Sequence, residues 1–223
     1  MGTKPRSPQV GHRSKSQAPG TDELRRQIAA DAARIMAEEG VRDFHAAKRK
    51  AAARLGLPET KHLPGNGEVD AALQEYLRLF HAGRLTQSLR RLRGLAAEAM
   101  RFLAKFEPRL VGPVLSGTVT SASAIQLHVT ADLPEEIGFW LQEHSIPYEQ
   151  ADRRLRFGGE RHETFPAYLF TADGVAVELC VFDRREARET PLSPVDGKPM
   201  KRANLREVEN LMHGAGETES RLR

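Results

Sequence analysis

The chain has 223 residues, of which 39% are hydrophobic and 29% are charged, and its formal net charge is +4. This composition is typical of a globular protein, and no apolar run approaches the roughly 18 residues that a membrane-spanning helix needs. A single cysteine, Cys180, excludes an internal disulfide and a cysteine-based zinc site. The first 20 residues are basic and lack the apolar segment of a secretory signal. We therefore expect a cytoplasmic location and no membrane partner.

The charge is divided unequally along the chain. Residues 1–107 contain 20 Lys and Arg against 12 Asp and Glu, whereas residues 108–223 contain 14 against 18. This division predicts two differently built halves. It favours an anionic partner for the first half, or a basic half that docks on the acidic half of the same chain. Residues 1–20 are rich in Pro, Gly, Ser and basic residues, so we expect a disordered basic tail.

Apolar residues at helical spacing predict a helical region at residues 21–107. The expected helices cover Asp22–Glu39, Val41–Leu55, Glu68–His81, and a fourth stretch between Thr86 and Pro108. Gly40 follows the first helix and Gly83 follows the third, where glycine commonly ends a helix. Thr86 is a suitable cap for the fourth helix. A loop rich in Pro, Gly and Asn is expected at residues 58–67. We therefore predict an N-terminal helical bundle.

Alternating apolar and polar residues predict strands in residues 108–184. The expected strands are Leu110–Leu115, Ala124–Thr130, Phe165–Thr171 and Val175–Phe182, with one or two short strands within residues 146–159. Asp132 is expected to cap a helix that runs to about His144, and Asp173-Gly174 forms a hairpin turn. The order of these elements predicts an α+β domain, a small mixed sheet with a flanking helix. Residues 185–223 should form a proline-rich strap, a short helix at Asn204–Met212 and a loose C-terminus.

Residues 111–132 combine a glycine-containing turn with an alternating strand. Gly112 and Gly117 precede that strand, and the later strand "VELCVF" carries Glu178. Over roughly residues 108–183 this layout resembles the nucleotidyltransferase superfamily, which has the polymerase-beta-like fold. Its members carry Asp-x-Asp on the first strand and a third carboxylate on the later one. The whole chain resembles a group of uncharacterised bacterial nucleotidyltransferase-like proteins that combine a helical region, this module and a C-terminal strap.

The resemblance implies a site, but the residues depart from its pattern. Alternate residues of a strand point the same way, so Asp-x-Asp directs two carboxylates at metal ions that offset phosphate charge. Here Ala124 and Gln126 occupy those positions, and Pro113 replaces the serine of the turn. Glu178 alone remains as a metal ligand and catalytic residue, with Mg²⁺ as the possible cofactor. Gln126 and His128 are the other catalytic candidates. The candidates for nucleotide or phosphate binding are Gly112, Ser116, Gly117, Thr118 and Ser123.

We therefore expect a catalytically degenerate nucleotidyltransferase-fold protein, a pseudoenzyme that binds a nucleotide, a nucleic acid or a protein partner. One alternative is an active metal-dependent enzyme with atypical ligands, such as Glu178 together with Asp183. Another is a basic helical nucleic-acid-binding protein that uses Lys48, Arg49 and Lys50.

Each candidate residue also has a structural interpretation. Glu178, Gln126 and His128 can be outward-facing sheet residues, and the serines and threonines can be ordinary turn residues. His128 with Ser116 or Ser123 lacks the orienting acid of a nucleophile pair. The stretch "RRLRF" at residues 153–157 fits an exposed strand or a phosphate grip.

Overall fold

The computed structural model describes residues 20–57 and 63–220. The helices are α1 (Thr21–Glu39), α2 (Phe44–Arg54), α3 (Asn66–Phe102), α4 (Gly112–Ser116), α5 (Glu135–Glu143) and α6 (Leu205–Ser220). The strands are β1 (Arg109–Val111), β2 (Ile125–Thr130), β3 (Glu149–Arg156), β4 (His162–Ala172) and β5 (Val175–Phe182). The α+β prediction is confirmed. The expected basic tail at residues 1–19, part of the expected loop at residues 58–62 and the last three residues lie outside the described residues.

The first two helices form as predicted, with one change of boundary. Gly40 ends α1 in the left-handed conformation, at φ +70°, which glycine adopts without strain. The second helix begins at Phe44 instead of Val41, because the carboxylate of Asp43 accepts a hydrogen bond from the Ala46 N–H at 2.6 Å. This side chain satisfies one of the free N–H groups of the first turn and so determines where α2 begins.

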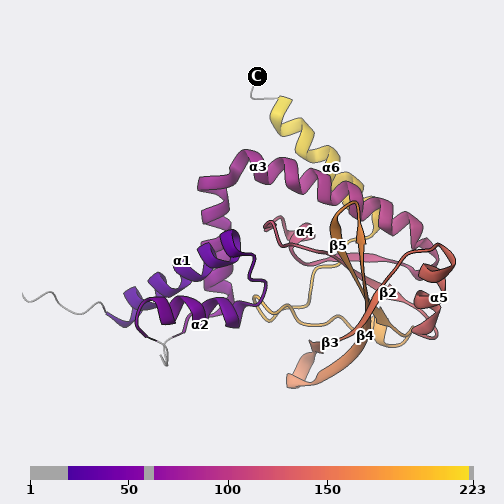
Figure 1. Cartoon of the computed structure of the whole chain (residues 1–223), viewed down its shortest axis with the longest axis horizontal. Helices are drawn as coiled ribbons and strands as arrows, with labels where there is room; N and C mark the ends of the chain where they lie inside the picture. The colour runs from indigo at the N-terminus through magenta and orange to yellow at the C-terminus, as the bar shows by residue number, and fades with distance from the viewer. Residues whose placement is uncertain (1–19, 58–62, 221–223) are drawn as a thin grey trace, which may run out of the picture.

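The predicted third and fourth helices are one continuous helix of 37 residues, α3. Gly83 lies inside this helix, and the Thr86 hydroxyl donates to the Ala82 carbonyl at 3.1 Å instead of capping a new helix. The expected break is therefore wrong. Tertiary packing overrides the weak helix preference of glycine, because the two ends of α3 are buried in different cores. Figure 1 shows that α3 changes direction between the end that packs on α1 and α2 and the end that lies over the sheet.

The five strands form one mixed sheet in the order β1-β2-β5-β4-β3. Only the central pair, β2 and β5, is parallel, and the other pairs are antiparallel. Asp173 and Gly174 make the tight turn between β4 and β5, with φ +48° and +72°, as predicted from the Asp-Gly signal. The predicted strand Leu110–Leu115 is wrong after Val111. Gly112 turns the chain at φ +69° and is the first residue of the short helix α4, with Pro113 in its first turn.

The cap predicted for α5 is also wrong. Pro134 is the cap residue and contributes no side-chain hydrogen bond, and the Asp132 carboxylate instead accepts from Arg184 Nε at 2.7 Å. The Glu136 carboxylate, in the first turn of α5, accepts the Leu133 N–H at 2.9 Å and so fixes the chain just before the helix. The C-terminal end near His144 is confirmed.

Three groups of buried side chains hold these elements together. The helical core joins α1, α2 and the first part of α3. The main core joins one face of the sheet with the second part of α3, with α5 and with Val208 of α6. On the other face of the sheet lies a smaller phenylalanine cluster, which consists of Phe157, Phe165, Cys180 and Phe182.

After the sheet, residues 189–204 form the strap. Its backbone contacts the end of β3, where Leu192 N–H donates to the Arg156 carbonyl at 2.6 Å, and β1, where Ala203 pairs with Leu110. Between these contacts the strap reaches α3, since the Asn66 amide donates to the Pro194 carbonyl at 2.7 Å. Figure 1 shows this path from the sheet to the helical region and back.

The last helix, α6, continues to Ser220, so the prediction of a short helix and a loose end is wrong up to that residue. Asn204 caps it reciprocally: its side chain accepts the Glu207 N–H at 3.0 Å, and the Glu207 carboxylate accepts the Asn204 N–H at 2.7 Å. In Figure 1 the helix lies along α3. Within the described part of the chain, no helix combines the length and apolar character needed to cross a bilayer.

Candidate functional site

The two predicted polar positions of the central strands lie on the same face of the sheet. Odd-numbered residues of β2 and β5, such as Leu127 and Leu179, point into the main core. Gln126 and Glu178 therefore point to the opposite face, and they are direct partners in the register of the parallel pair. Neighbouring strands lie about 4.8 Å apart, so the two side chains are adjacent. The structure thus brings together two of the three catalytic candidates.

Glu178 is already bound by a cation. Arg153 of β3 donates from Nε to one carboxylate oxygen at 2.8 Å and from Nη2 to the other at 2.7 Å. The Glu178 side chain is 15% exposed and that of Arg153 is 33% exposed, so solvent screens this pair only in part. The same contacts raise the pKa of Arg153. Arg153 belongs to the "RRLRF" stretch, and its partner is this carboxylate.

Gln126 fills the space above the glycine turn. A Cβ placed on Gly112 would lie 2.0 Å from Gln126 Oε1, so the amide rests directly against the Cα of the glycine. In the site that the resemblance implies, this glycine would let the backbone approach phosphate. Here a side chain of the protein occupies that position. Pro113, which follows, contributes no N–H donor.

The remaining phosphate-binding candidates hold the turn together. Gly117 ends α4 at φ +92°, and its N–H donates to the Pro113 carbonyl at 2.8 Å. The Ser116 hydroxyl lies 3.4 Å from the hydroxyl of Thr118, a long contact within the same turn. The Ser123 hydroxyl accepts the Thr120 N–H at 2.9 Å. These contacts match the structural interpretation of the turn residues.

Arg93 of α3 is a buried cation that sequence reasoning missed. It is 9% exposed, and its guanidinium donates to the carbonyls of Val114 and Leu115, both at 3.2 Å. These carbonyls belong to the last turn of α4 and have no partner within the helix. Burial lowers the pKa of Arg93. In the sequence it stands among several arginines of one helix, and only the tertiary fold singles it out.

His128, the third catalytic candidate, lies apart from Glu178. It is the register partner of Cys180, two residues further along β2 than Gln126. Its ring packs against Phe182 with 4.7 Å between the ring centroids, and it is 6% exposed. Neither candidate serine is hydrogen-bonded to it, because both are bonded within the turn. The structure therefore contains no serine–histidine nucleophile pair at this position.

The donors near Glu178 do not fit Mg²⁺. The ion prefers several hard oxygen ligands, usually including more than one carboxylate or phosphate group. Here one carboxylate, bound at both oxygens by Arg153, stands beside the neutral amide of Gln126. Asp183, the alternative ligand, accepts the N–H groups of Arg185 and Glu186 at 2.6 Å. Across residues 20–57 and 63–220, no three His, Cys, Asp or Glu side chains are grouped as a metal site would require.

Neither a scan against protein-family models nor a search of curated proteins finds a match for this chain.

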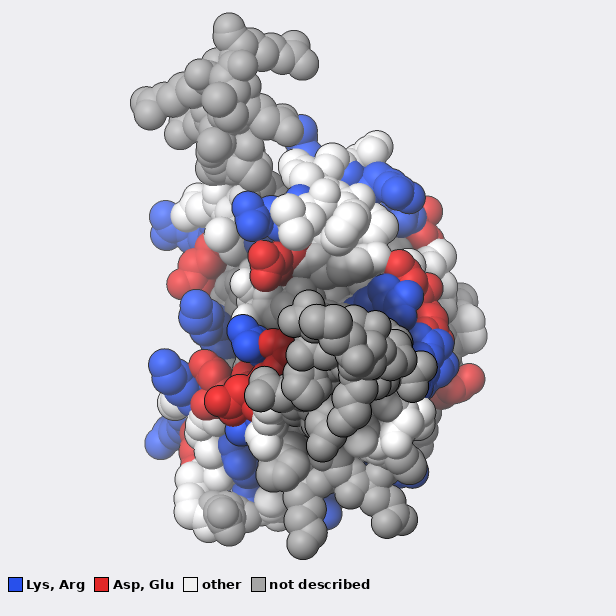
Figure 2. Space-filling view, turned by 90° about the vertical axis from the view of Figure 1, so that its left-hand side faces the viewer, with Lys and Arg blue, Asp and Glu red and all other residues white. Residues whose placement is uncertain are grey.

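The basic face of α2 is mostly engaged within the protein. Lys50 and Arg54 pair with Glu39, at 2.5 and 2.8 Å. Lys48 donates to the Asn66 side chain at 2.8 Å and so ties α2 to the start of α3. Figure 2, which faces the helical region, shows basic and acidic side chains interspersed, with no broad area of one sign among the described residues. This arrangement gives little support to a nucleic-acid interface on α2.

The charged halves of the chain also contact each other directly. Arg91 of α3 pairs with Asp173 at 2.7 Å, and Arg101 pairs with Glu209 of α6 at 2.6 Å. All four side chains are substantially exposed, so each pair contributes little to stability. The contacts nevertheless match the intramolecular interpretation of the charge division.

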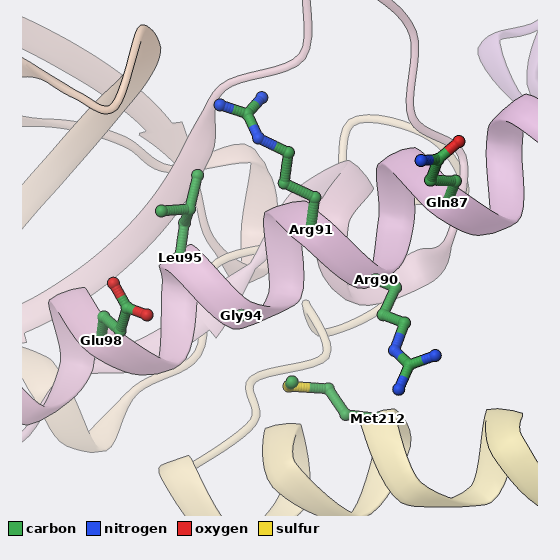
Figure 3. Close-up of a pocket in the computed structure, with 7 residues that line it drawn as sticks. All are labelled: Gln87, Arg90, Arg91, Gly94, Leu95, Glu98 and Met212. Atoms are coloured by element: carbon green, nitrogen blue, oxygen red, sulfur yellow. The ribbon is translucent and has the colours of Figure 1, made fainter.

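One surface pocket, of about 460 Å³, lies where α3 faces α6. Figure 3 shows its residues: Gln87, Arg90, Arg91, Gly94, Leu95, Glu98 and Met212. They do not converge on one point. Arg90 extends toward α6 and Met212, whereas Arg91 and Leu95 point to the other side of α3. None of the predicted site residues lines this pocket.

Proposed function

We propose that this protein is a nucleotidyltransferase-like protein that binds a nucleotide without transferring it. The observation that carries the proposal is the two-point ion pair between Glu178 and Arg153 beside Gln126. A carboxylate held in this way is not free to coordinate the ions that nucleotidyl transfer requires.

The topology supports the nucleotidyltransferase-like part of the proposal. A strand, a glycine turn and a second strand follow one another as β1, α4 and β2. The residue expected at the third carboxylate position, Glu178, lies on β5, the parallel neighbour of β2. Glu178 faces the same side of the sheet as Gln126, which stands at an expected aspartate position. The order and pairing of these strands are therefore compatible with the layout of a nucleotidyltransferase site.

The side chains on that frame argue against metal-dependent catalysis. Ala124, at the first expected aspartate position, is 5% exposed and has no group that can bind metal. Gln126 carries no charge and rests on Gly112. Two divalent metal ions at this position would face only Glu178, whose charge Arg153 already neutralises. The phosphate groups of the ligand alone would then have to offset the repulsion between the two ions.

The test is a transfer assay with the full chain, labelled nucleoside triphosphates, Mg²⁺ or Mn²⁺, and protein, RNA and water as acceptors. We expect no transfer by the native chain. Calorimetry should detect binding of at least one nucleotide, with an affinity that does not depend on Mg²⁺. The Glu178→Ala variant should bind that nucleotide as the native chain does.

Two results would overturn the proposal. The first is nucleotide transfer that disappears in Glu178→Ala, which would make Glu178 a catalytic residue. The second is binding of RNA or a protein partner, with no binding of any nucleotide. The Arg153→Gln variant is a further check. It frees the Glu178 carboxylate, but we expect no nucleotide transfer, because no second metal-binding carboxylate is present beside it among the described residues.

A further inference from the structure

A second pocket, of about 290 Å³, opens at the carboxyl ends of the parallel strands β2 and β5. Its walls come from the start of β1, the ends of both strands, the turn after β5 and the end of the strap. The lining residues are Glu107, Arg109, His128, Thr130, Phe182, Ala187 and Arg202. Its volume is close to the lower limit of small-molecule pockets, roughly 300 Å³.

Two arginines in this pocket have no acid paired with them among the described residues. Arg202 donates to the Ala187 carbonyl at 3.2 Å and to the Thr190 hydroxyl at 2.6 Å, so it is held by neutral acceptors. Burial lowers the pKa of Arg202, and the charge of the nearby Arg109 lowers it further. Two neighbouring guanidinium groups repel each other, and an anion between them would relieve that repulsion.

His128 adds a buried polar group that lacks a partner. The side chain is 6% exposed, and its Nδ1 has no hydrogen-bond partner in the described structure. Buried polar atoms are nearly always hydrogen-bonded, so the unmet nitrogen of this pocket-lining residue leaves a hydrogen bond to be made by water or by a ligand. Burial and the charge of Arg202 lower the pKa of His128 to about 3, so the imidazole is neutral near pH 7. A neutral imidazole still has one N–H to donate.

The charges of the pocket determine the class of ligand. The lining contains two guanidinium groups against the single carboxylate of Glu107, and His128 is neutral. Glu107 also lies near Arg184, which is paired with Asp132 at 2.7 Å. The pocket therefore has an excess of positive charge and several N–H donors. Arginine pairs well with phosphate because several of its donors can engage the oxygens together.

We propose that the pocket formed by Arg109, His128 and Arg202 binds the phosphate group of a small phosphorylated ligand. The volume exceeds that of a phosphate ion and leaves room for a small organic group beside it. The site is separate from Gln126 and Glu178, so it does not depend on the proposed nucleotide-binding function.

The test is calorimetric titration of the full chain with inorganic phosphate, glycerol phosphate and a nucleoside monophosphate, all at constant ionic strength. We expect saturable binding, with tighter binding of at least one ester than of inorganic phosphate. Arg109→Gln should weaken binding by about tenfold, because it removes a charge-assisted contact. Arg78→Gln is the matched control: it removes the same charge from an exposed position on α3 and should leave binding unchanged.

Arg202→Gln should weaken binding at least as much, but Arg202 also ties the strap to Thr190. Thermal unfolding of this variant separates loss of binding from loss of fold, and Arg109→Gln decides the question if the variant is unstable. If inorganic phosphate binds most tightly, the preferred ligand is the free anion and the proposed phosphate ester is wrong. The proposal is overturned if no phosphate compound binds saturably, or if Arg78→Gln weakens binding as much as Arg109→Gln does.

Discussion

Arg153 on β3 reaches across β4 to hold both carboxylate oxygens of Glu178 on β5. The contact links an outer strand of the sheet to a central one without using the strand between them. It also occupies the one carboxylate that metal-dependent transfer would need. This pair of side chains thus links β3 to β5 and keeps Glu178 from binding a metal ion.

Replacement of either member of this pair should destabilise the protein. We expect Glu178→Gln and Arg153→Gln each to lower the free energy of unfolding by about 1–2 kcal/mol, because each leaves a partly buried group without its partner. The double variant should lose less than the sum of the two. Urea unfolding measures all three, and Arg154→Gln, an exposed neighbour, should change stability by less than about 0.5 kcal/mol. Strict additivity would show that the pair is not coupled.

Gly112→Ala should be destabilising, for two separable reasons. The added Cβ would meet Gln126 Oε1 at 2.0 Å, and φ of +69° is unfavourable for alanine. We expect a loss of about 1–2 kcal/mol, most of it from the backbone conformation, because the Gln126 amide ends a flexible side chain that can turn away from the added methyl group. The double variant Gly112→Ala, Gln126→Ala should recover only the part of the unfolding free energy that the contact with Gln126 costs. Equal stability of the single and double variants would show that Gln126 does not rest on the glycine.

Gly83→Ala should have the opposite effect. Gly83 lies in the interior of α3, and a Cβ added there would meet no atom within 4 Å. Alanine restricts the unfolded chain and suits a helix, so we expect a gain of about 0.5–1 kcal/mol. Gly40→Ala, at a left-handed helix end, is the informative contrast and should reduce stability. Thermal unfolding of the two variants should therefore shift in opposite directions.

Cys180 should not react with thiol reagents while the protein is folded. It is 4% exposed in the phenylalanine cluster, and burial raises the pKa of its thiol to about 12. The reactive thiolate is therefore almost absent at pH 8. Ellman's reagent should label the thiol only after denaturant is added. Rapid labelling of the native protein would contradict the packing assigned to this face of the sheet.

His128 should make the folded state sensitive to acid. The unfolded chain binds a proton at this residue near pH 6.5, whereas the folded chain does not until about pH 3. The neutral His128 therefore contributes fully to the free energy of unfolding above pH 6.5. This contribution is lost as the pH falls toward 3, by at most about 1.4 kcal/mol per pH unit. The difference in unfolding free energy between the native chain and His128→Gln should follow this slope between pH 6 and 4. A difference that does not depend on pH would contradict it.

Local patterns were sufficient to predict most of the fold. The alternation in β2 and β5 and the Asp173-Gly174 turn identify these strands, because one face of each strand is buried. The same alternation indicates that Gln126 and Glu178 each point away from the buried face of their strand, and the register of the two strands makes them partners. The continuous α3 could not be predicted in this way. Gly83 and Thr86 have the local character of an interruption, and only packing at both ends of the helix overrides it.

The partners of the candidate residues depend on the topology of the sheet. Arg153 faces Glu178 because β3 lies next to β4 and β4 next to β5, an order that the spacing of residues does not specify. Arg202 lines the same pocket as His128 because the strap returns to β1, where Ala203 pairs with Leu110. Sequence patterns can indicate which face of a strand a residue occupies, but not which distant side chain will meet it there.

The course of α3 has a consequence for any attempt to divide the protein. Its first part completes the helical core, through Val69, Leu73 and Leu77, and its second part completes the main core, through Leu92 and Met100. A fragment that ends after this helix would present to water the face that normally covers the sheet. The complementary fragment would begin with an uncovered sheet. We therefore expect that neither fragment produced by a cut at the end of α3 folds alone, and that the two cores unfold together.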